Sequence, residues 1–139
     1  MKNLSPKDAW AWLQAEQARC EAAGLEGPLF VDVRMEIESL YVGRPPGVEN
    51  IPWYEYPDLT PNPQRFAEAV EKEVGDKARP VLLICRSGKR TLDAGAALEA
   101  AGFANVAHVL HGFEGELNDA FKRSSLNGWR FEGLPWEQM

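Results

Sequence analysis

The sequence has few of the residues that build metal centres, disulfide frameworks or membrane spans. Its 139 residues include only two cysteines and two histidines, which form no zinc-binding pattern. No apolar run approaches the ~20 residues that cross a bilayer, and no apolar stretch follows the first residues as in a secretory signal. We therefore expect a cytoplasmic protein with reduced cysteines, no membrane partner, no metal and no cofactor.

An excess of positive charge is also missing. The chain carries 15 basic and 21 acidic side chains, a net charge of −6, whereas binding to nucleic-acid phosphates needs a basic face. We therefore expect no nucleic-acid partner. One short segment departs from the acidic balance, and Cys85 lies in it. Residues 76–93 contain Lys77, Arg79, Arg86, Lys89 and Arg90 against Asp76 and Asp93.

Length and composition are those of one ordinary globular domain. Apolar residues make up 45% and charged residues 26% of the chain, which excludes disorder. The length is sufficient for one core without staples. No internal repeat or linker interrupts the chain, so we predict a single domain over residues 1–139.

Helix signals mark four segments. Residues 5–23 begin with a serine cap and a proline, and residues 62–75 begin with Asn-Pro and end at a glycine. Residues 90–101 have helical apolar spacing and are followed by a glycine. A short helix is also predicted over residues 113–121.

Strand signals alternate with these helices. Continuous apolar runs at residues 29–33, 80–85 and 106–110 are typical of strands covered on both faces of a parallel sheet. A further short strand is predicted at 48–52, in an otherwise irregular stretch. This alternation predicts an α/β domain around a mainly parallel sheet. The aromatic tail, residues 127–139, is expected to pack back on the body through its tryptophans.

Cys85 is the residue most suited to chemistry. It ends the apolar run 80–85 and precedes the predicted helix 90–101, at the end of the strands where open parallel sheets bind ligands. The first amides of a helix lack intrahelical partners and carry about half a positive charge, so they stabilise an anion. The pKa of a cysteine falls from about 8.5 to about 3.5–7.5 in such surroundings. We predict a nucleophilic thiolate at Cys85; the alternative is a buried cysteine that only packs.

Residues 85–91 read Cys-Arg-Ser-Gly-Lys-Arg-Thr and resemble the active-site loop of single-domain rhodaneses, sulfurtransferases that carry sulfane sulfur as a cysteine persulfide. Four other segments match that family's motifs in the same order. They are Phe30-Val31-Asp32-Val33-Arg34 with Glu38, Pro46-Gly47-Val48-Glu49-Asn50-Ile51-Pro52, Ala101-Gly102-Phe103-Ala104-Asn105-Val106 and Gly133-Leu134-Pro135-Trp136. The resemblance covers residues 28–136, and five ordered motifs are much more specific than one.

The resemblance implies a rhodanese-like three-layer fold, with four to five mainly parallel strands flanked by helices. It also implies a thiosulfate sulfurtransferase-like enzyme. Cys85 would attack a small anionic donor such as thiosulfate, become a persulfide and pass the outer sulfur to a thiol or protein acceptor. The loop residues that would bind the substrate and the persulfide are Arg86, Ser87, Gly88, Lys89, Arg90 and Thr91.

Each part of this loop has an expected role. Backbone amides of residues 86–90 would surround the persulfide anion, and Gly88 would permit the tight backbone path. Thr91 would donate a hydroxyl hydrogen bond. Arg86 and Lys89 would attract the anionic donor, and Arg90 would brace the loop.

Two alternative functions stay open. Cysteine-based phosphatases and arsenate reductases share the strand, cysteine loop and helix, but protein tyrosine phosphatases place an arginine six positions after the cysteine, where this chain has Thr91. The basic residue here is Arg90, so the loop is one residue short for a phosphoryl group, and Ile84 stands where those enzymes usually have histidine. The second alternative to a sulfurtransferase is a rhodanese-like interaction module with a non-catalytic Cys85.

Three residues of the first motif are predicted to give structural support, although Asp32 and Arg34 could instead be catalytic because Asp32 ends near the same edge of the sheet. We expect Arg34 to pair with a carboxylate such as Glu38, and Asp32 to bond to loop backbone. The sequence departs from the family nearby. Gly43-Arg44-Pro45-Pro46-Gly47 replaces Gly-His-Ile-Pro-Gly and puts the shape of a pocket wall in doubt, and Leu110-His111-Gly112 stands where many members have Leu-x-Gly-Gly.

The remaining candidates have a structural interpretation beside the functional one. Trp53–Tyr56 could wall a substrate groove or belong to the core. His111 could reach the pocket, but no acidic partner accompanies it in the sequence. His108 is expected to be a core or surface histidine, and Cys20 a packing residue rather than a resolving thiol.

Overall fold

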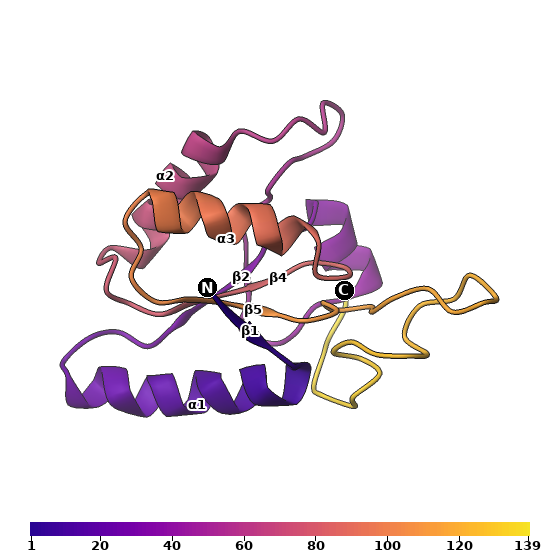
Figure 1. The fold of residues 1–139 in the computed structure, drawn as a ribbon, viewed down its shortest axis with the longest axis horizontal. Coiled ribbons are helices and arrows are strands. Elements are labelled where there is room, and N and C mark those ends of the chain that lie inside the picture. The colour runs from indigo at the N-terminus through magenta and orange to yellow at the C-terminus, as the bar shows by residue number, and fades with distance from the viewer.

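The computed structural model describes residues 1–139 and shows three layers (Figure 1). Five parallel strands form the central sheet in the order β1-β5-β4-β2-β3. The strands are β1 (Lys2–Leu4), β2 (Leu29–Asp32), β3 (Glu49–Asn50), β4 (Val81–Ile84) and β5 (Val106–Val109). The predicted α/β fold with a parallel sheet of four to five strands is confirmed.

Helices cover both faces of this sheet. Helix α1 (Pro6–Ala22) lies along one face, and α2 (Pro63–Val74) and α3 (Arg90–Ala100) lie along the other (Figure 1). A short π-helical segment, η1 (Glu38–Val42), follows β2. None of these helices combines the length and apolar character that a membrane crossing requires.

The helices begin where their capping residues predict. The Ser5 side chain accepts a hydrogen bond from the Asp8 amide ahead of α1, and the Asn62 side chain accepts one from the Arg65 amide ahead of α2. A proline occupies the first helical position in both cases. Helix α2 ends at Gly75, whose φ of 74° suits glycine.

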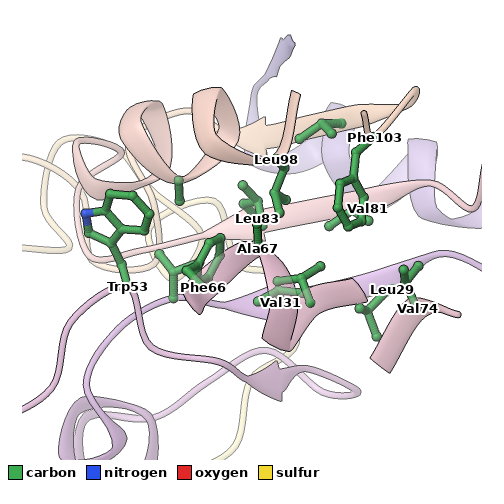
Figure 2. Packing of buried hydrophobic residues seen from close by; sticks show 14 of the residues in the cluster. Leu29, Val31, Trp53, Phe66, Ala67, Val74, Val81, Leu83, Leu98 and Phe103 are labelled. Atoms are coloured by element: carbon green, nitrogen blue, oxygen red, sulfur yellow. The ribbon is translucent and has the colours of Figure 1, made fainter. Parts of the chain in front are cut away.

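Strand side chains alternate between two buried clusters. In β4, Val81 and Leu83 pack toward α2 and α3, whereas Leu82 and Ile84 pack toward α1. Both faces are therefore apolar, which explains the continuous apolar runs. Figure 2 shows the first cluster, where strand and helix side chains interlock: Leu29, Val31, Val81 and Leu83 with Phe66, Ala67, Val74 and Leu98.

Two sequence-based predictions need correction. The predicted helix 113–121 is wrong, because the chain there forms turns. The Asn118 side chain accepts hydrogen bonds from the amides of Ala120 and Lys122, which competes with helical bonding. Gly115 has a φ of 77° and approaches the backbone of Asn127. Conversely, β1 was not predicted, because three residues are too few to show a strand pattern.

The aromatic tail folds back on the sheet. Trp129 is fully buried between Trp10 and Phe30, and its indole N–H donates to the Pro135 carbonyl at 2.7 Å. Arg44 pairs with Glu137 through two backbone hydrogen bonds of 2.8 and 2.9 Å. The backbone of Arg44 therefore joins the tail to the segment after η1, and its side chain adds an ion pair with Glu137 at 3.4 Å.

Candidate active site

Cys85 follows β4 directly, and α3 begins five residues later at Arg90. The tight turn between them brings the Gly88 amide to 3.1 Å from Cys85 Sγ, where it donates a hydrogen bond. Gly88 has a φ of 91°, in the region that favours glycine. No side chain caps α3 at Lys89, so the first amides of the helix are left for another acceptor. This geometry suits a sulfur anion.

The sulfur lies at the edge of the core. Cys85 is only 1% exposed and belongs to the cluster between the sheet and the α2–α3 layer. Of the amides at 86–90 that were expected to surround it, only that of Gly88 forms a hydrogen bond with Sγ. Cys20 is also a free thiol, but it is buried on α1, and this helix lies along the opposite face of the sheet (Figure 1).

The segment after β5 forms backbone hydrogen bonds with the loop that begins at Cys85. The Phe113 amide donates to the Cys85 carbonyl at 2.8 Å, and the Glu114 amide donates to the Arg86 carbonyl at 2.9 Å. A side chain at Gly112 would collide with these same backbone groups, which explains a glycine there. His111 has a φ of 65°, so a residue other than glycine adopts the left-handed backbone at this turn.

Arg90 braces the loop through Glu38. Its guanidinium donates to both carboxylate oxygens, at 2.8 and 2.9 Å, and lies 5.5 Å from the Tyr54 ring centre. Burial alone would raise the pKa of Glu38, but the hydrogen bonds and charge of Arg90 outweigh it and hold that pKa below its usual value. The first residue of α3 is therefore tied to η1 by a partly buried bidentate ion pair.

Arg34 pairs with a carboxylate, as predicted, but the partner is Asp32 and not Glu38. Arg34 donates instead to both carboxylate oxygens of Asp32, at 2.9 and 2.7 Å, and to the Gly43 carbonyl at 2.6 Å. Asp32 and Arg34 are both 0% exposed, and the Arg34 guanidinium lies over the Phe113 ring. The two side chains alternate to the same face of the chain after β2, so they meet more readily than residues on either side of a turn. Asp32 also accepts the Arg34 amide, as expected of a carboxylate bonded to loop backbone.

The outer face of the loop borders a small cavity. Arg86 and Lys89 are exposed, and with Ser87 they line a cavity of about 240 Å³. The remaining lining residues are Glu116, Leu117 and Arg123, which the sequence analysis did not identify. A basic residue in a polar, turn-rich stretch carries no signal that separates it from ordinary surface, so Arg123 could be found only from the fold.

The other candidates fall into different places. Trp53 is buried against Phe66, and with Tyr54 it lines a separate cavity of about 360 Å³ that contains no residue of the loop 85–91. Tyr56 is 75% exposed. His111 does have an acidic neighbour, contrary to expectation, because Glu116 Oε1 lies 4.0 Å from its Nδ1.

Thr91 contacts both the Cys85 sulfur and a buried histidine. Its hydroxyl oxygen is 3.7 Å from Cys85 Sγ and 2.7 Å from Nδ1 of His108. The opposite ring nitrogen, Nε2, is 2.7 Å from Oδ1 of Asn3 on β1. His108 is therefore a core residue, one of the two predicted possibilities, but it is joined to the loop. Neither this link nor Asn3 was visible in the sequence.

Comparisons with known proteins place this geometry in a family. A family profile described as rhodanese-like domain matches residues 6–118, and no curated protein matched the chain. The crystal structure of Rv0390 from M. tuberculosis superposes with a TM-score of 0.80 and 32% identity, covering 100% of this chain and 98% of that one.

More distant structures share the fold. A rhodanese with anions from E. coli has a TM-score of 0.53 and 18% identity over 81% of this chain and 100% of its own. A Rhodopseudomonas palustris protein of unknown function, described as a possible tyrosine phosphatase, has a TM-score of 0.54 and 22% identity. The match covers 99% of this chain and 85% of that protein. Since the family profile covers most of the residues, including the loop at Cys85, the chain belongs to the rhodanese-like domain family.

Proposed function

We propose that this protein is a sulfurtransferase that forms a persulfide on Cys85 from a small anionic sulfane-sulfur donor. Membership in the rhodanese-like family supports sulfur donors and acceptors as its partners. The single observation that carries the proposal is the hydrogen bond of 3.1 Å from the Gly88 amide to Cys85 Sγ, at the uncapped start of α3. A donor amide and a helix start both stabilise a sulfur anion.

With thiosulfate the reaction has two steps. The Cys85 thiolate attacks the outer sulfur of the donor, a new S–S bond forms, and the S–S bond of thiosulfate breaks to release sulfite. A thiol or protein acceptor then attacks the outer sulfur of the persulfide and regenerates the thiolate. In each step the leaving group takes the electron pair of the broken bond, so no external oxidant or reductant is needed.

The arrangement of Arg90 argues against phosphatase chemistry. An arginine that binds a phosphoryl group must present its N–H fork to the substrate. The fork of Arg90 is engaged with Glu38 at 2.8 and 2.9 Å. The likeness to the R. palustris protein is one of fold, and a fold hosts many functions.

Intact mass after incubation with thiosulfate tests the proposal. We expect wild type to gain about 32 Da, one sulfur atom, which cyanide removes. Cys85→Ala should gain nothing, whereas Cys20→Ala should behave as wild type because Cys20 is buried under the other face. Absence of any adduct on wild type would favour the interaction module, and turnover of an aryl phosphate would favour a phosphatase.

The charges around the loop make a second prediction. Replacing Arg86 and Lys89 together with Gln should lower kcat/KM for thiosulfate about tenfold at low ionic strength, because both exposed cations attract an anionic donor. The difference from wild type should shrink as salt is added, since screening weakens steering. The matched control is Lys7→Gln with Lys72→Gln, two exposed lysines on α1 and α2. An equal loss in that control would contradict steering by the loop.

A further inference from the structure

A continuous line of polar side chains runs from Cys85 through the core to the edge strand. Sγ is 3.7 Å from the Thr91 hydroxyl, Thr91 is 2.7 Å from Nδ1 of His108, and Nε2 of His108 is 2.7 Å from Oδ1 of Asn3. The strand β1 lies beside β5 (Figure 1). The two strands pair in parallel, and Asn3 is opposite His108 in their register. Thr91 is fully buried and His108 is 1% exposed.

The chemistry of these groups fixes the direction of the hydrogen bonds. A carbonyl oxygen only accepts, so with Oδ1 of Asn3 facing it Nε2 must carry the ring proton of a neutral His108. Nδ1 is then bare and accepts from the Thr91 hydroxyl. The single hydroxyl proton is therefore directed away from sulfur, and the lone pairs of Thr91 face Sγ. This direction suits a protonated thiol, which donates to Thr91.

A sulfur anion requires the opposite direction. Of the two directions, only the one that turns the Thr91 hydroxyl toward Sγ adds a hydrogen bond from Thr91 to a thiolate or persulfide. That direction leaves Nδ1 of His108 without a donor unless Nδ1 itself holds the ring proton. Nε2 must then accept, which Asn3 permits by rotating its side-chain amide so that Nδ2 donates. Asparagine is suited to this place because its two ends have opposite hydrogen-bonding character.

We propose that Thr91, His108 and Asn3 form a reversible hydrogen-bond chain whose direction follows the charge on Cys85, which makes His108 a positioning residue for the sulfur anion. When the thiol ionises, its proton passes to Thr91, the Thr91 proton passes to Nδ1, and the Nε2 proton leaves to water beside Asn3. One proton is lost in total, and the ring is neutral before and after. The inference rests on the proposed sulfur-carrying role of Cys85.

Burial and one nearby positive charge favour the neutral form of the ring. Burial, followed by the positive charge of the N-terminal amine, holds the pKa of His108 below its usual value. That amine is paired with Glu99 of α3 at 2.8 Å. On the side of Cys85 the charged group is Arg90, which is tied to Glu38. A neutral ring can reverse its two hydrogen bonds by moving one proton, whereas an imidazolium donates from both nitrogens and has no direction to reverse.

The direction of the chain can be read from the position of the ring proton. We would label the full-length protein with ¹³C and ¹⁵N and follow the ring shifts of histidine while pH is raised through the ionisation of Cys85, monitored by its alkylation rate with iodoacetamide. The protein has only two histidines, so the half-exposed His111 is an internal reference.

We expect the His108 ring proton to move from Nε2 to Nδ1 at the pH at which alkylation rises. Thr91→Val removes the link at nearly constant shape, so the ring transition should vanish and the alkylation profile should move up by about one pH unit, tenfold in thiolate. Thr91→Ser restores the hydroxyl and should restore both. Cys85→Ala should show no transition, and amide spectra check that each variant is folded.

An unchanged tautomer in wild type across the Cys85 ionisation would overturn the inference, and so would a transition that persists unaltered in Thr91→Val. These readouts need no sulfur transfer. A coupled transition without any persulfide from thiosulfate supports the reversible chain while contradicting the proposed function. Persulfide formation with a fixed His108 tautomer supports the proposed function and contradicts the reversible chain.

Discussion

Replacing Arg34 with Leu is expected to lower the free energy of unfolding by about 3–5 kcal/mol. Arg34 and Asp32 are both 0% exposed, and the guanidinium donates to both Asp32 oxygens and to the Gly43 carbonyl. Without it, Asp32 becomes a buried carboxylate with only the amide of residue 34 as donor. The loss therefore comes mainly from an uncompensated charge, and urea denaturation measures it.

Two variants identify the cause of that loss. Adding Asp32→Asn to Arg34→Leu removes the orphaned charge, so the double variant should be more stable than Arg34→Leu alone. Arg65→Leu, at an exposed position on α2, should change stability by less than about 0.5 kcal/mol. If the double variant is the less stable, or if Arg34→Leu costs no more than Arg65→Leu, the buried pair is not the support that its geometry suggests.

Replacing Gly88 with Ala is expected to slow persulfide formation about 100-fold. The new Cβ would lie 3.0 Å from the His111 backbone nitrogen, at a residue whose φ of 91° already disfavours a side chain. The His111 nitrogen belongs to the backbone and cannot rotate away as a side chain can, so the loop must shift. The Gly88 amide that donates to Cys85 Sγ would move with it. The measurement is the rate of the mass increase with thiosulfate.

Gly75→Ala is the matched control for this variant. Gly75 has a φ of 74° but no atom within 4 Å of the added Cβ, and it ends α2 away from the loop. Both variants should lose about 1–2 kcal/mol of stability from the strained backbone. Only Gly88→Ala should lose activity. A similar activity in the two would mean that the position of the Gly88 amide does not govern the sulfur.

Local patterns in the sequence predicted most of the elements that position Cys85. The serine and asparagine caps, the glycine after α2 and the continuous apolar run of β4 each act within a few residues. The predictions failed where local signals conflicted. Residues 113–121 were predicted to form a helix, but the Asn118 side chain accepts hydrogen bonds from the nearby amides of Ala120 and Lys122.

The ion-pair partners of charged side chains were harder to predict from the sequence than the helices and strands. Arg34 and Glu38 are four residues apart and of opposite charge, so pairing them was reasonable from the sequence. Glu38 instead meets Arg90, 52 residues away, and Arg34 returns to Asp32. Which carboxylate an arginine reaches depends on how β2, η1 and α3 are placed in space, and no local pattern encodes that placement.

The sequence by itself determined the layered α/β architecture and the position of one cysteine between a strand and a helix, since hydrophobic periodicity, capping and turn chemistry are local properties. Only the tertiary structure decided what surrounds that cysteine. The Gly88 amide, the brace of Arg90 on Glu38, the cavity with Arg123 and the line from Thr91 through His108 to Asn3 all join distant segments. Such contacts exist because parallel strands and their helices meet at one edge of the sheet, and that meeting is a property of the folded chain.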